Sequence, residues 1–299
     1  MTPPAFIYSP RYAVPIGGHV FPTRKFALTA EILKSRGVFL EPDLPSREEL
    51  LLAHTPEWTD KILGTIPMTL ADQTRAELPF SPEISVAHRL SYSGTILACR
   101  RALEDGAGLH VGGGSHHAFA DRGEGFCLLN DIAGGILAML SEGRLRRAAV
   151  VDLDVHQGNG TAAIFRGRPE VFTFSMHQED IYPEAPETSS LDLELPAGCR
   201  DRDYLKILEE NLPRAFAAKP DLVVYQAGVD AAEDDALGGL RLTPEGLKRR
   251  DLLVREACRN FNAPAAVTLG GGYAADVRET ARRHARTLLI FAGIEPSIS

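Results

Sequence analysis

Residues 150–160 (VVDLDVHQGNG) begin as an apolar strand and end in polar side chains followed by a glycine-rich turn. Successive side chains of a strand alternate between faces, so Asp152, Asp154 and His156 are expected to point the same way. A short apolar run of this kind is typical of a buried parallel strand, and open parallel sheets place their sites at the carboxyl ends of strands. A solvated cluster of charges is the alternative. Two carboxylates and an imidazole instead favour a site for a divalent ion such as zinc.

Composition narrows the class of protein. The 299 residues carry a formal net charge of −8 and have a sequence pI of about 5.6, without a dense block of basic residues, so nucleic-acid binding is not expected. No apolar stretch has the length of a membrane span, and the first residues lack the pattern of a secretory leader. The four cysteines are widely spaced, which argues against a disulfide framework or a thiolate metal site. We therefore expect a cytoplasmic protein with no membrane partner.

Apolar runs with the length of strands alternate with helix-like segments. The predicted strands are residues 6–8, 109–111, 148–153, 171–176, 222–227, 265–269 and 287–291. Helical spacing of apolar residues covers 201–218 and 244–261, and Ser-Pro-Glu at 81–83 and Thr-Pro-Glu at 243–245 are helix-start signals. This alternation predicts an α/β fold: one domain, residues 1–299, with a mostly parallel central sheet of about eight strands and helices on both faces.

Four polar or glycine-rich motifs each follow a predicted strand. They are residues 112–117 (GGGSHH), 152–160, 225–230 (YQAGVD) and 270–273 (GGGY). Each has an ordinary explanation when taken alone: an incidental histidine pair, a helix N-cap, or a turn with a packing aromatic. Because the ends of parallel strands meet at one edge of a sheet, we interpret the four together as one site.

Metal chemistry assigns the first roles. A catalytic zinc uses about three protein ligands and keeps one position open. Asp154, His156 and Asp230 supply such a set from two neighbouring strand ends. A divalent ion held there acts as a Lewis acid toward a substrate carbonyl.

The remaining polar side chains fit acid–base catalysis. His116 and His117 can take and return a proton near neutral pH, and Tyr273 can donate a hydrogen bond to a developing oxyanion. Asp152 and Asn159 are candidates to orient the two histidines. Since an aspartate raises a histidine pKa more than an asparagine does, we predict that His116 stays charged and that His117 shuttles the proton.

Other titratable residues lack this support. We interpret six histidines as structural or exposed: His19, His54, His88, His110, His177 and His284. The run Glu233, Asp234, Asp235 is interpreted as a solvated acidic loop.

The motifs resemble the arginase-like histone deacetylase superfamily, which includes acetylpolyamine amidohydrolases and acetoin-utilisation proteins. The resemblance extends from residues 8–10 (YSP) to the GGGY motif. GGGSHH, residues 121–127 (DRGEGFC), residues 156–160 (HQGNG) and the run 225–240 are most similar to class IV deacetylases.

That resemblance implies hydrolysis of an N6-acyl-lysine amide, with one zinc held by Asp154, His156 and Asp230. It implies a general base and acid at His117, an electrostatic partner at His116 and a carbonyl-polarising donor at Tyr273.

It also implies further groups. A structural potassium or sodium ion would be bound by Asp152, the carbonyls of Asp154 and His156, the Ser175 hydroxyl and the Met176 carbonyl. A second such ion in some relatives maps near Phe165, Arg168 and Val171, where the arginine is a departure. A narrow acyl tunnel would be formed by Gly125 and Phe126 on one side, with Tyr182 and Leu237 opposite.

Several readings of the substrate stay open. The expected partner is an acyl-lysine protein or peptide, and the nearest alternative is a small acylated amine such as a polyamine. The acidic run at 233–235 keeps this alternative open. A catalytically inactive acyl-lysine binding module and a binuclear manganese hydrolase are less consistent with the complete three-ligand set. The alanine- and arginine-rich composition suggests a bacterial source, so a histone need not be the substrate.

Overall fold

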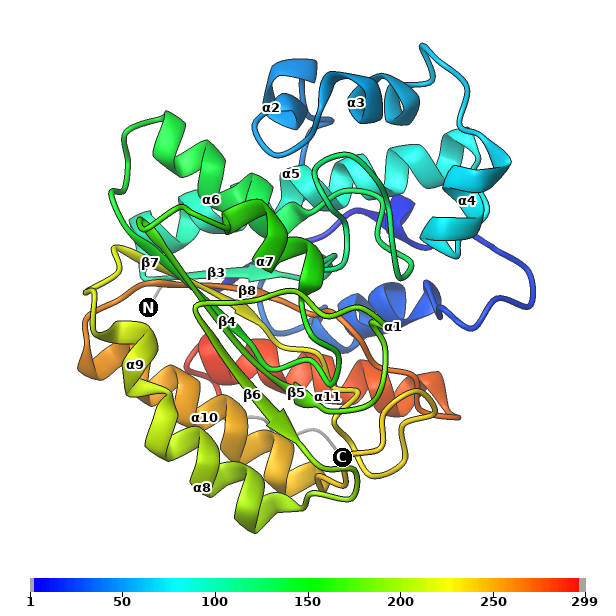
Figure 1. The fold of residues 1–299 in the computed structure, drawn as a ribbon. Helices are drawn as coiled ribbons and strands as arrows, with labels where there is room; N and C mark the ends of the chain where they lie inside the picture. The colour runs from blue at the N-terminus through cyan, green and yellow to red at the C-terminus, as the bar shows by residue number, and fades with distance from the viewer. Residues whose placement is uncertain (1–2, 296–299) are drawn as a thin grey trace.

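The computed structural model describes residues 3–295, and its centre is one sheet of eight parallel strands (Figure 1). The strand order is β2-β1-β3-β8-β7-β4-β5-β6. The strands are β1 (Ala5–Ile7), β2 (Val38–Leu40), β3 (Ala107–His110), β4 (Ala148–Asp152), β5 (Val171–Gln178), β6 (Leu191–Leu195), β7 (Leu222–Gln226) and β8 (Ala265–Thr268). All neighbouring pairs are parallel. The predicted α/β class with a parallel central sheet is confirmed.

One predicted strand is wrong and two strands were not predicted. Residues 287–291 form the last part of helix α11 (Val277–Phe291), where all five side chains are buried. A helix end that is buried all round shows no helical periodicity, so its apolar run looks like a strand. The strands that were not predicted, β2 and β6, are the two edges of the sheet. β6 reads LDLEL and β2 is largely exposed, so neither has the apolar run of a buried central strand.

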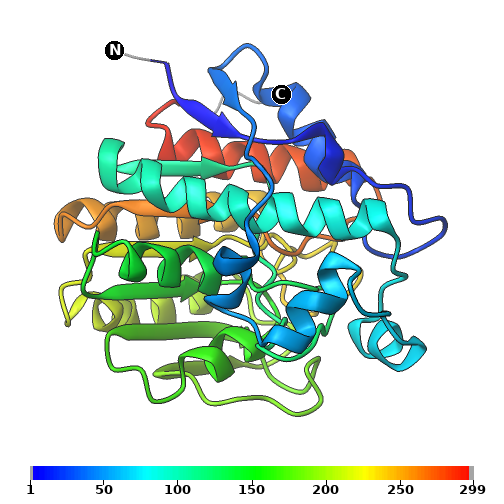
Figure 2. The same cartoon turned by 90° about the horizontal axis from the view of Figure 1, so that it is seen from above.

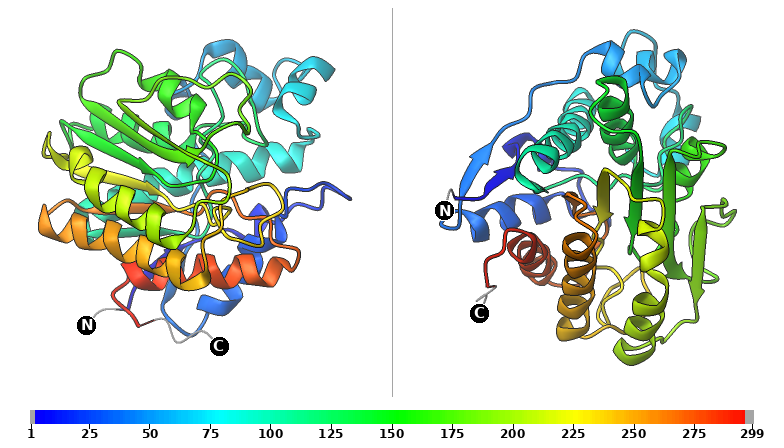
Figure 3. Two further views of the ribbon diagram at one scale, coloured as in Figure 1. Left: turned by 60° about the horizontal axis from the view of Figure 1, so that its bottom comes forward. Right: turned by 90° about the vertical axis from the view of Figure 1, so that its left-hand side faces the viewer.

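Two layers of helices cover the sheet, as the end-on view in Figure 3 shows. One layer contains α1 (Arg24–Leu33), α8 (Asp201–Asn211), α9 (Pro213–Phe216), α10 (Pro244–Asn260) and α11. The other contains α5 (Pro82–Asp105), α6 (Asp131–Ser141) and α7 (Asn159–Phe165), with α2 (Arg47–Leu51), α3 (Pro56–Leu63) and α4 (Leu70–Ala76) outside them. Each layer contributes side chains to its own apolar cluster. None of the described helices is long and apolar enough to cross a membrane.

Strand β4 shows how the sheet separates these two clusters. Ala149 and Val151 pack into the cluster that contains α8–α11, while Ala148 and Val150 pack into the one that contains α5 and α6. Both faces of the strand are therefore buried, which accounts for its continuous apolar sequence. A slip of one residue in its pairing would exchange the two sets of side chains.

The predicted helix starts are present. The Ser81 hydroxyl accepts a hydrogen bond from the backbone N–H of Ile84, and Pro82 occupies the first turn of α5. The Thr243 hydroxyl accepts from the N–H of Gly246 at the start of α10. Each cap satisfies a backbone donor that the helix itself leaves without a partner.

The four sequence motifs follow β3, β8, β7 and β4, which are four consecutive strands at the centre of the sheet. Figure 2 shows this central part of the sheet from above. Parallel pairing brings their carboxyl ends to a common edge. The fold thus gathers segments that are more than 100 residues apart in the sequence.

Candidate active site

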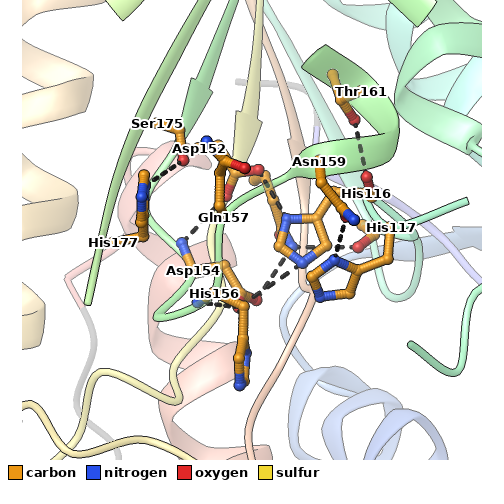
Figure 4. Close-up of polar contacts among 12 residues, drawn as sticks. His116, His117, Asp152, Asp154, His156, Gln157, Asn159, Thr161, Ser175 and His177 are labelled. Carbon is orange, nitrogen blue, oxygen red and sulfur yellow. Dashed lines mark hydrogen bonds and ion pairs between the residues drawn. The ribbon is translucent and has the colours of Figure 1, made fainter. Parts of the chain in front are cut away.

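Asp154, His156 and Asp230 form the centre of the site (Figure 4 shows the first two). Ligand atoms of these three buried residues lie within 4.8 Å of one another. The His156 Nδ1 atom is 3.1 Å from Asp154 Oδ1 and 3.4 Å from Asp230 Oδ2. Asp230 Oδ2 is buried and has no hydrogen-bond partner among residues 3–295, which is the state expected of a ligand atom. The set therefore fits a divalent metal ion.

Two glycines make room for this cluster. A Cβ atom added to Gly271 would lie 1.8 Å from Asp230 Oδ2, and one added to Gly228 would lie 2.2 Å from Asp154 Oδ2. Backbone approaches the carboxylates closely at both positions, and the Gly271 N–H donates to Asp154 Oδ2 at 2.9 Å. Any side chain at these positions would displace a candidate ligand.

The cluster carries excess negative charge. Burial alone would lower the pKa of His156, but Asp154 and Asp230 raise it to about 10. Burial, together with the charge of Asp154, raises the pKa of Asp230 to about 7. The two carboxylates thus favour a positive charge between them, which a divalent cation would supply.

The tandem histidines lie beside this cluster with different partners. His116 Nδ1 donates to Asp152 Oδ2 at 2.7 Å, and His117 Nδ1 lies 2.7 Å from Asn159 Oδ1 (Figure 4). Burial opposes the charged form of His116, but Asp152 and Asp154 raise its pKa to about 9. Burial and the neighbouring imidazolium groups hold the pKa of His117 well below its usual range. One ring is therefore cationic and the other is neutral.

Tyr273 faces the same space. It lines both cavities of the site, and its ring lies 6.2 Å from that of Phe126. Burial, with the charges of Asp230 and Asp154, raises the pKa of Tyr273 well above 10, so the hydroxyl keeps its proton and can donate it in a hydrogen bond. Its backbone N–H donates to Asp235 Oδ2 at 2.7 Å.

The interpretation of residues 233–235 as a solvated acidic loop is wrong for one of the three. Asp235 is half-buried and also accepts from the N–H groups of Leu237 and Gly238, at 2.9 and 3.1 Å. Asp234 forms a two-bond ion pair with Arg283. Glu233 and Asp234 are both exposed, as the sequence suggested. Asp235 thus ties the Tyr273 backbone to the loop that carries Leu237.

Sequence reasoning missed three residues that hold the motif loops in place. Asp131 accepts from the N–H groups of Gly114 and Ser115, at 2.9 and 2.7 Å. Gln226 Nε2 donates to Asp154 Oδ2 at 3.2 Å, and the fully buried Lys25 donates to the Gly270 carbonyl at 2.7 Å. Gln226 stands within a quoted motif, whereas nothing in the local sequence marks Lys25.

The histidines set aside in the sequence are mostly structural. Hydrogen bonds engage His19, His54, His110 and His177 outside the metal cluster. His284 is buried, and neither of its ring nitrogens has a hydrogen-bond partner in the described part of the chain. His88 lines the inner cavity defined below.

Two cavities meet at the candidate metal site. The entrance cavity is lined by Glu77, His117, Gly125, Phe126, His156, Tyr182, Leu237 and Tyr273. The inner cavity shares five of these residues and extends to buried groups that include Tyr12, Phe26 and Gly270. All four predicted tunnel residues thus line the entrance cavity. Phe126 adopts a positive φ of 66°, which is uncommon for a bulky side chain and places it on the wall.

The residues proposed for monovalent cations lie in two places. Asp152 of β4 and Ser175 of β5 are paired in the sheet register, one residue before Met176. The Ser175 hydroxyl lies 2.9 Å from His177 Nδ1. Phe165, Arg168 and Val171 line a separate cavity that includes Ala148, at the opposite end of β4.

Comparison with known proteins places these features in a family. Residues 19–288 match the histone deacetylase domain. An uncharacterized protein of Picosynechococcus is 43% identical, over 93% of this chain and 95% of its own length. Histone deacetylase 2 of Arabidopsis thaliana is 31% identical over 90% of this chain and 74% of its own, and the acetoin utilization protein AcuC of Bacillus subtilis is 27% identical over 97% and 82%. The crystal structure of the HDA15 HD domain has the same fold, with a TM-score of 0.80, 23% identity and coverage of 100% of this chain and 90% of that one.

Proposed function

Because this chain belongs to the histone deacetylase family, we propose that it is a zinc-dependent amidohydrolase that removes acyl groups from N6-acyl-lysine. The family and its deacetylase relatives support amide hydrolysis in general. One observation carries the finer proposal. Two histidines, one bonded to an aspartate and the other to an asparagine, lie side by side with ring centroids 4.1 Å apart, against a buried Asp-His-Asp cluster at the junction of two cavities.

Zinc is the metal that fits an Asp2His set best, and when bound it would polarise the scissile carbonyl and acidify water. Asp154, His156 and Asp230 would hold it. A monovalent cation between Asp152 and Ser175 belongs to the same proposal, as do membership of class IV and a cytoplasmic location.

The chain's own residues then account for the proton transfers. His117 Nε2 takes a proton from the attacking water while its Nδ1–H stays donated to Asn159. As the amide C–N bond breaks, the same nitrogen returns the proton to the leaving amine. Lysine and a carboxylate are the products. His116 remains an imidazolium that stabilises the developing negative charge, and the Tyr273 hydroxyl donates to the carbonyl oxygen.

The cavities suggest how the substrate is held. The entrance cavity presents Phe126, Tyr182 and Leu237, which would grip the lysine methylenes by burying them. The inner cavity includes the rings of Tyr12, Phe21 and Phe26. We propose that this apolar space receives the acyl group, acetyl or longer, and the substrate series below measures the length that it accepts.

A small acylated amine is the second candidate substrate, and Glu77 favours it. This exposed carboxylate lines the entrance cavity. Partial burial raises the pKa of Glu77, and the negative charge of the nearby Glu124 raises it further. An acidic entrance attracts a cationic amine. The acidic run Glu233, Asp234 and Asp235, which suggested this alternative in the sequence, does not line the cavity.

The deciding experiment compares peptides that carry acetyl-, octanoyl- and myristoyl-lysine with acetylated spermidine, before and after chelation and after zinc is restored. Metal-dependent cleavage of a peptide supports lysine deacylation, and the preferred chain length measures the inner cavity. Cleavage of acetylated spermidine alone would indicate that the substrate is a small acylated amine and not a protein or peptide. A zinc-loaded protein that cleaves none of them but binds an acyl-lysine peptide would instead be a binding module.

A further inference from the structure

The carboxylate of Glu124 accepts a hydrogen bond from Asn159, the residue that also contacts His117. Asn159 Nδ2 donates to Glu124 Oε1 at 2.9 Å, while Asn159 Oδ1 lies 2.7 Å from His117 Nδ1. The asparagine is fully buried, and these are its only side-chain hydrogen bonds within the described part of the chain. Glu124, Asn159 and His117 thus form a continuous line of three side chains that ends at the candidate base.

The direction of this line matters for the base. An asparagine amide has an accepting oxygen at one end and a donating nitrogen at the other, and it can rotate by 180° to exchange them. In the rotated form the NH2 group would face His117 Nδ1 and force the ring proton onto Nε2. A histidine with its proton on Nε2 has no free nitrogen there to take a proton from water.

We propose that Glu124 is a positioning residue that locks the Asn159 amide, and through it the tautomer in which His117 keeps its proton on Nδ1. An ionised carboxylate accepts hydrogen bonds and has no proton to donate, so the rotated amide would place an oxygen against it. The inference rests on the proposed role of His117 as base. It deepens that proposal by naming the group that prepares it.

Glu124 is itself held firmly enough for this task. Its second oxygen accepts from Arg122 Nε at 3.3 Å, and its side chain is only 20% exposed. Backbone hydrogen bonds link it in both directions with Cys127, at 3.0 and 2.9 Å. The carboxylate therefore approaches Asn159 from a short closed turn.

The same contact explains why an asparagine suits position 159 in this chain. An aspartate there would place one carboxylate against another, and like charges at hydrogen-bond distance cannot both stay ionised at low cost. With asparagine at this position, the negative charge is on Glu124 and not directly beside His117. The Asn159 amide, oriented by Glu124, in turn fixes which nitrogen of His117 carries the proton.

The first test reads the tautomer directly. Imidazole 15N chemical shifts of the purified protein, assigned with a His117→Ala variant, show which ring nitrogen carries the proton. We expect the proton on Nδ1 in the wild type and at least partly on Nε2 in Glu124→Ala. A proton that stays on Nδ1 in Glu124→Ala overturns the proposal. This spectrum requires no turnover, so it separates failure of the lock from failure of the deacylase assignment.

The second test measures how substitutions of Glu124 change turnover. Glu124→Ala should lower kcat by about 10- to 100-fold with little change in KM, because only the preparation of the base is lost. Glu124→Gln keeps an accepting oxygen and should stay within about tenfold of the wild type. Asp121→Ala is the matched control from the same turn, since its exposed side chain pairs with Arg122 and has no contact with Glu124 or Asn159 among those described, and it should change kcat by less than about twofold.

A rescue completes the design. Asn159→Asp should be impaired because two carboxylates then face each other, whereas Asn159→Asp combined with Glu124→Gln restores a donor–acceptor pair. We expect the double variant to exceed Asn159→Asp by about tenfold in kcat, which a merely structural role of Glu124 would not produce. A double variant that is slower than Asn159→Asp contradicts the lock.

Discussion

The metal cluster and the entrance cavity share His156, yet they are built by different parts of the fold. Asp154 and Asp230 follow β4 and β7, whose pairing fixes Asp152 opposite Gln226 and so places the two carboxylates. The entrance is made by loops instead. Glu77 caps α4 in a left-handed conformation, and Tyr182 and Leu237 lie in loops beyond β5 and β7.

The difference suggests a division of labour. Side chains fixed by a buried sheet can keep the sub-ångström geometry that a metal and a proton transfer require. Loops at the surface can change without disturbing the sheet, and they are where substrate selectivity is usually set. Substitutions in the cluster should therefore abolish chemistry, while substitutions at the entrance should mainly change which substrate is preferred.

Removal of a metal ligand should have the largest effect. Asp230→Ala should lose bound zinc and lower turnover by about 1000-fold or more, since the metal supplies several kcal/mol of transition-state stabilisation. Metal content measured by mass spectrometry and kcat check this. Asp234→Ala is the control from the same loop, because Asp234 pairs with Arg283 and is outside the cluster. Full zinc occupancy in Asp230→Ala would exclude Asp230 as a ligand.

The second-largest effect on kcat should come from the two histidines, and it should differ between them. His117→Ala should lower kcat by about 100- to 10,000-fold, the usual range for a general acid–base group. His116→Ala should cost about 10- to 100-fold, since a neighbouring charge is lost and the base remains. Both variants should keep their zinc, and matched kcat measurements on one acyl-lysine peptide check the ratio. Equal losses in the two variants would contradict the division between a neutral shuttle and a fixed cation.

Tyr273 lines the entrance cavity but acts next to the metal cluster, so a substitution there tests whether the two regions have separate roles. Tyr273→Phe removes one hydrogen-bond donor and keeps the ring, and it should lower kcat by about 100- to 1000-fold. Metal content should stay at the wild-type level, because the hydroxyl is no part of the Asp-His-Asp set. Wild-type turnover in this variant would remove Tyr273 from the reaction.

The same division explains what the sequence could predict. Asp154, His156 and Asp230 could be grouped because the carboxyl ends of parallel strands meet at a common edge, which requires little more than the order of residues. The alternation expected along the strand does not reach Asp154 and His156, because β4 ends at Asp152 and the chain bends after it. Asp235 and Lys25 could not, since their partners are backbone groups of Tyr273 and Gly270, and such contacts leave no pattern in the sequence. The strand predicted at 287–291 failed for a related reason. Burial on every side removes the periodicity that distinguishes a helix from a strand.

Substitution of Glu77 should have the smallest effect on kinetics, and it tests directly whether the entrance cavity recognises the charge of the substrate. Glu77→Gln removes a charge and little volume, so kcat for a neutral acetyl-lysine peptide should stay unchanged. KM for acetylated spermidine should rise by up to about fivefold, because an exposed ion pair contributes at most about 1 kcal/mol. The rise should shrink at high ionic strength, since salt screens exposed charges.

Glu57→Gln provides the control for that test, as Glu57 is exposed and lines neither cavity. If KM for the polyamine does not change in Glu77→Gln, the entrance does not recognise substrate charge, and the small-amine alternative loses its structural support. If kcat for the peptide falls as well, the entrance loop is coupled to the catalytic cluster, and the separation between sheet and loops is incomplete. A change confined to KM for the cationic substrate is the outcome that the architecture predicts, because Glu77 touches the path of the substrate and none of the groups that transfer the proton.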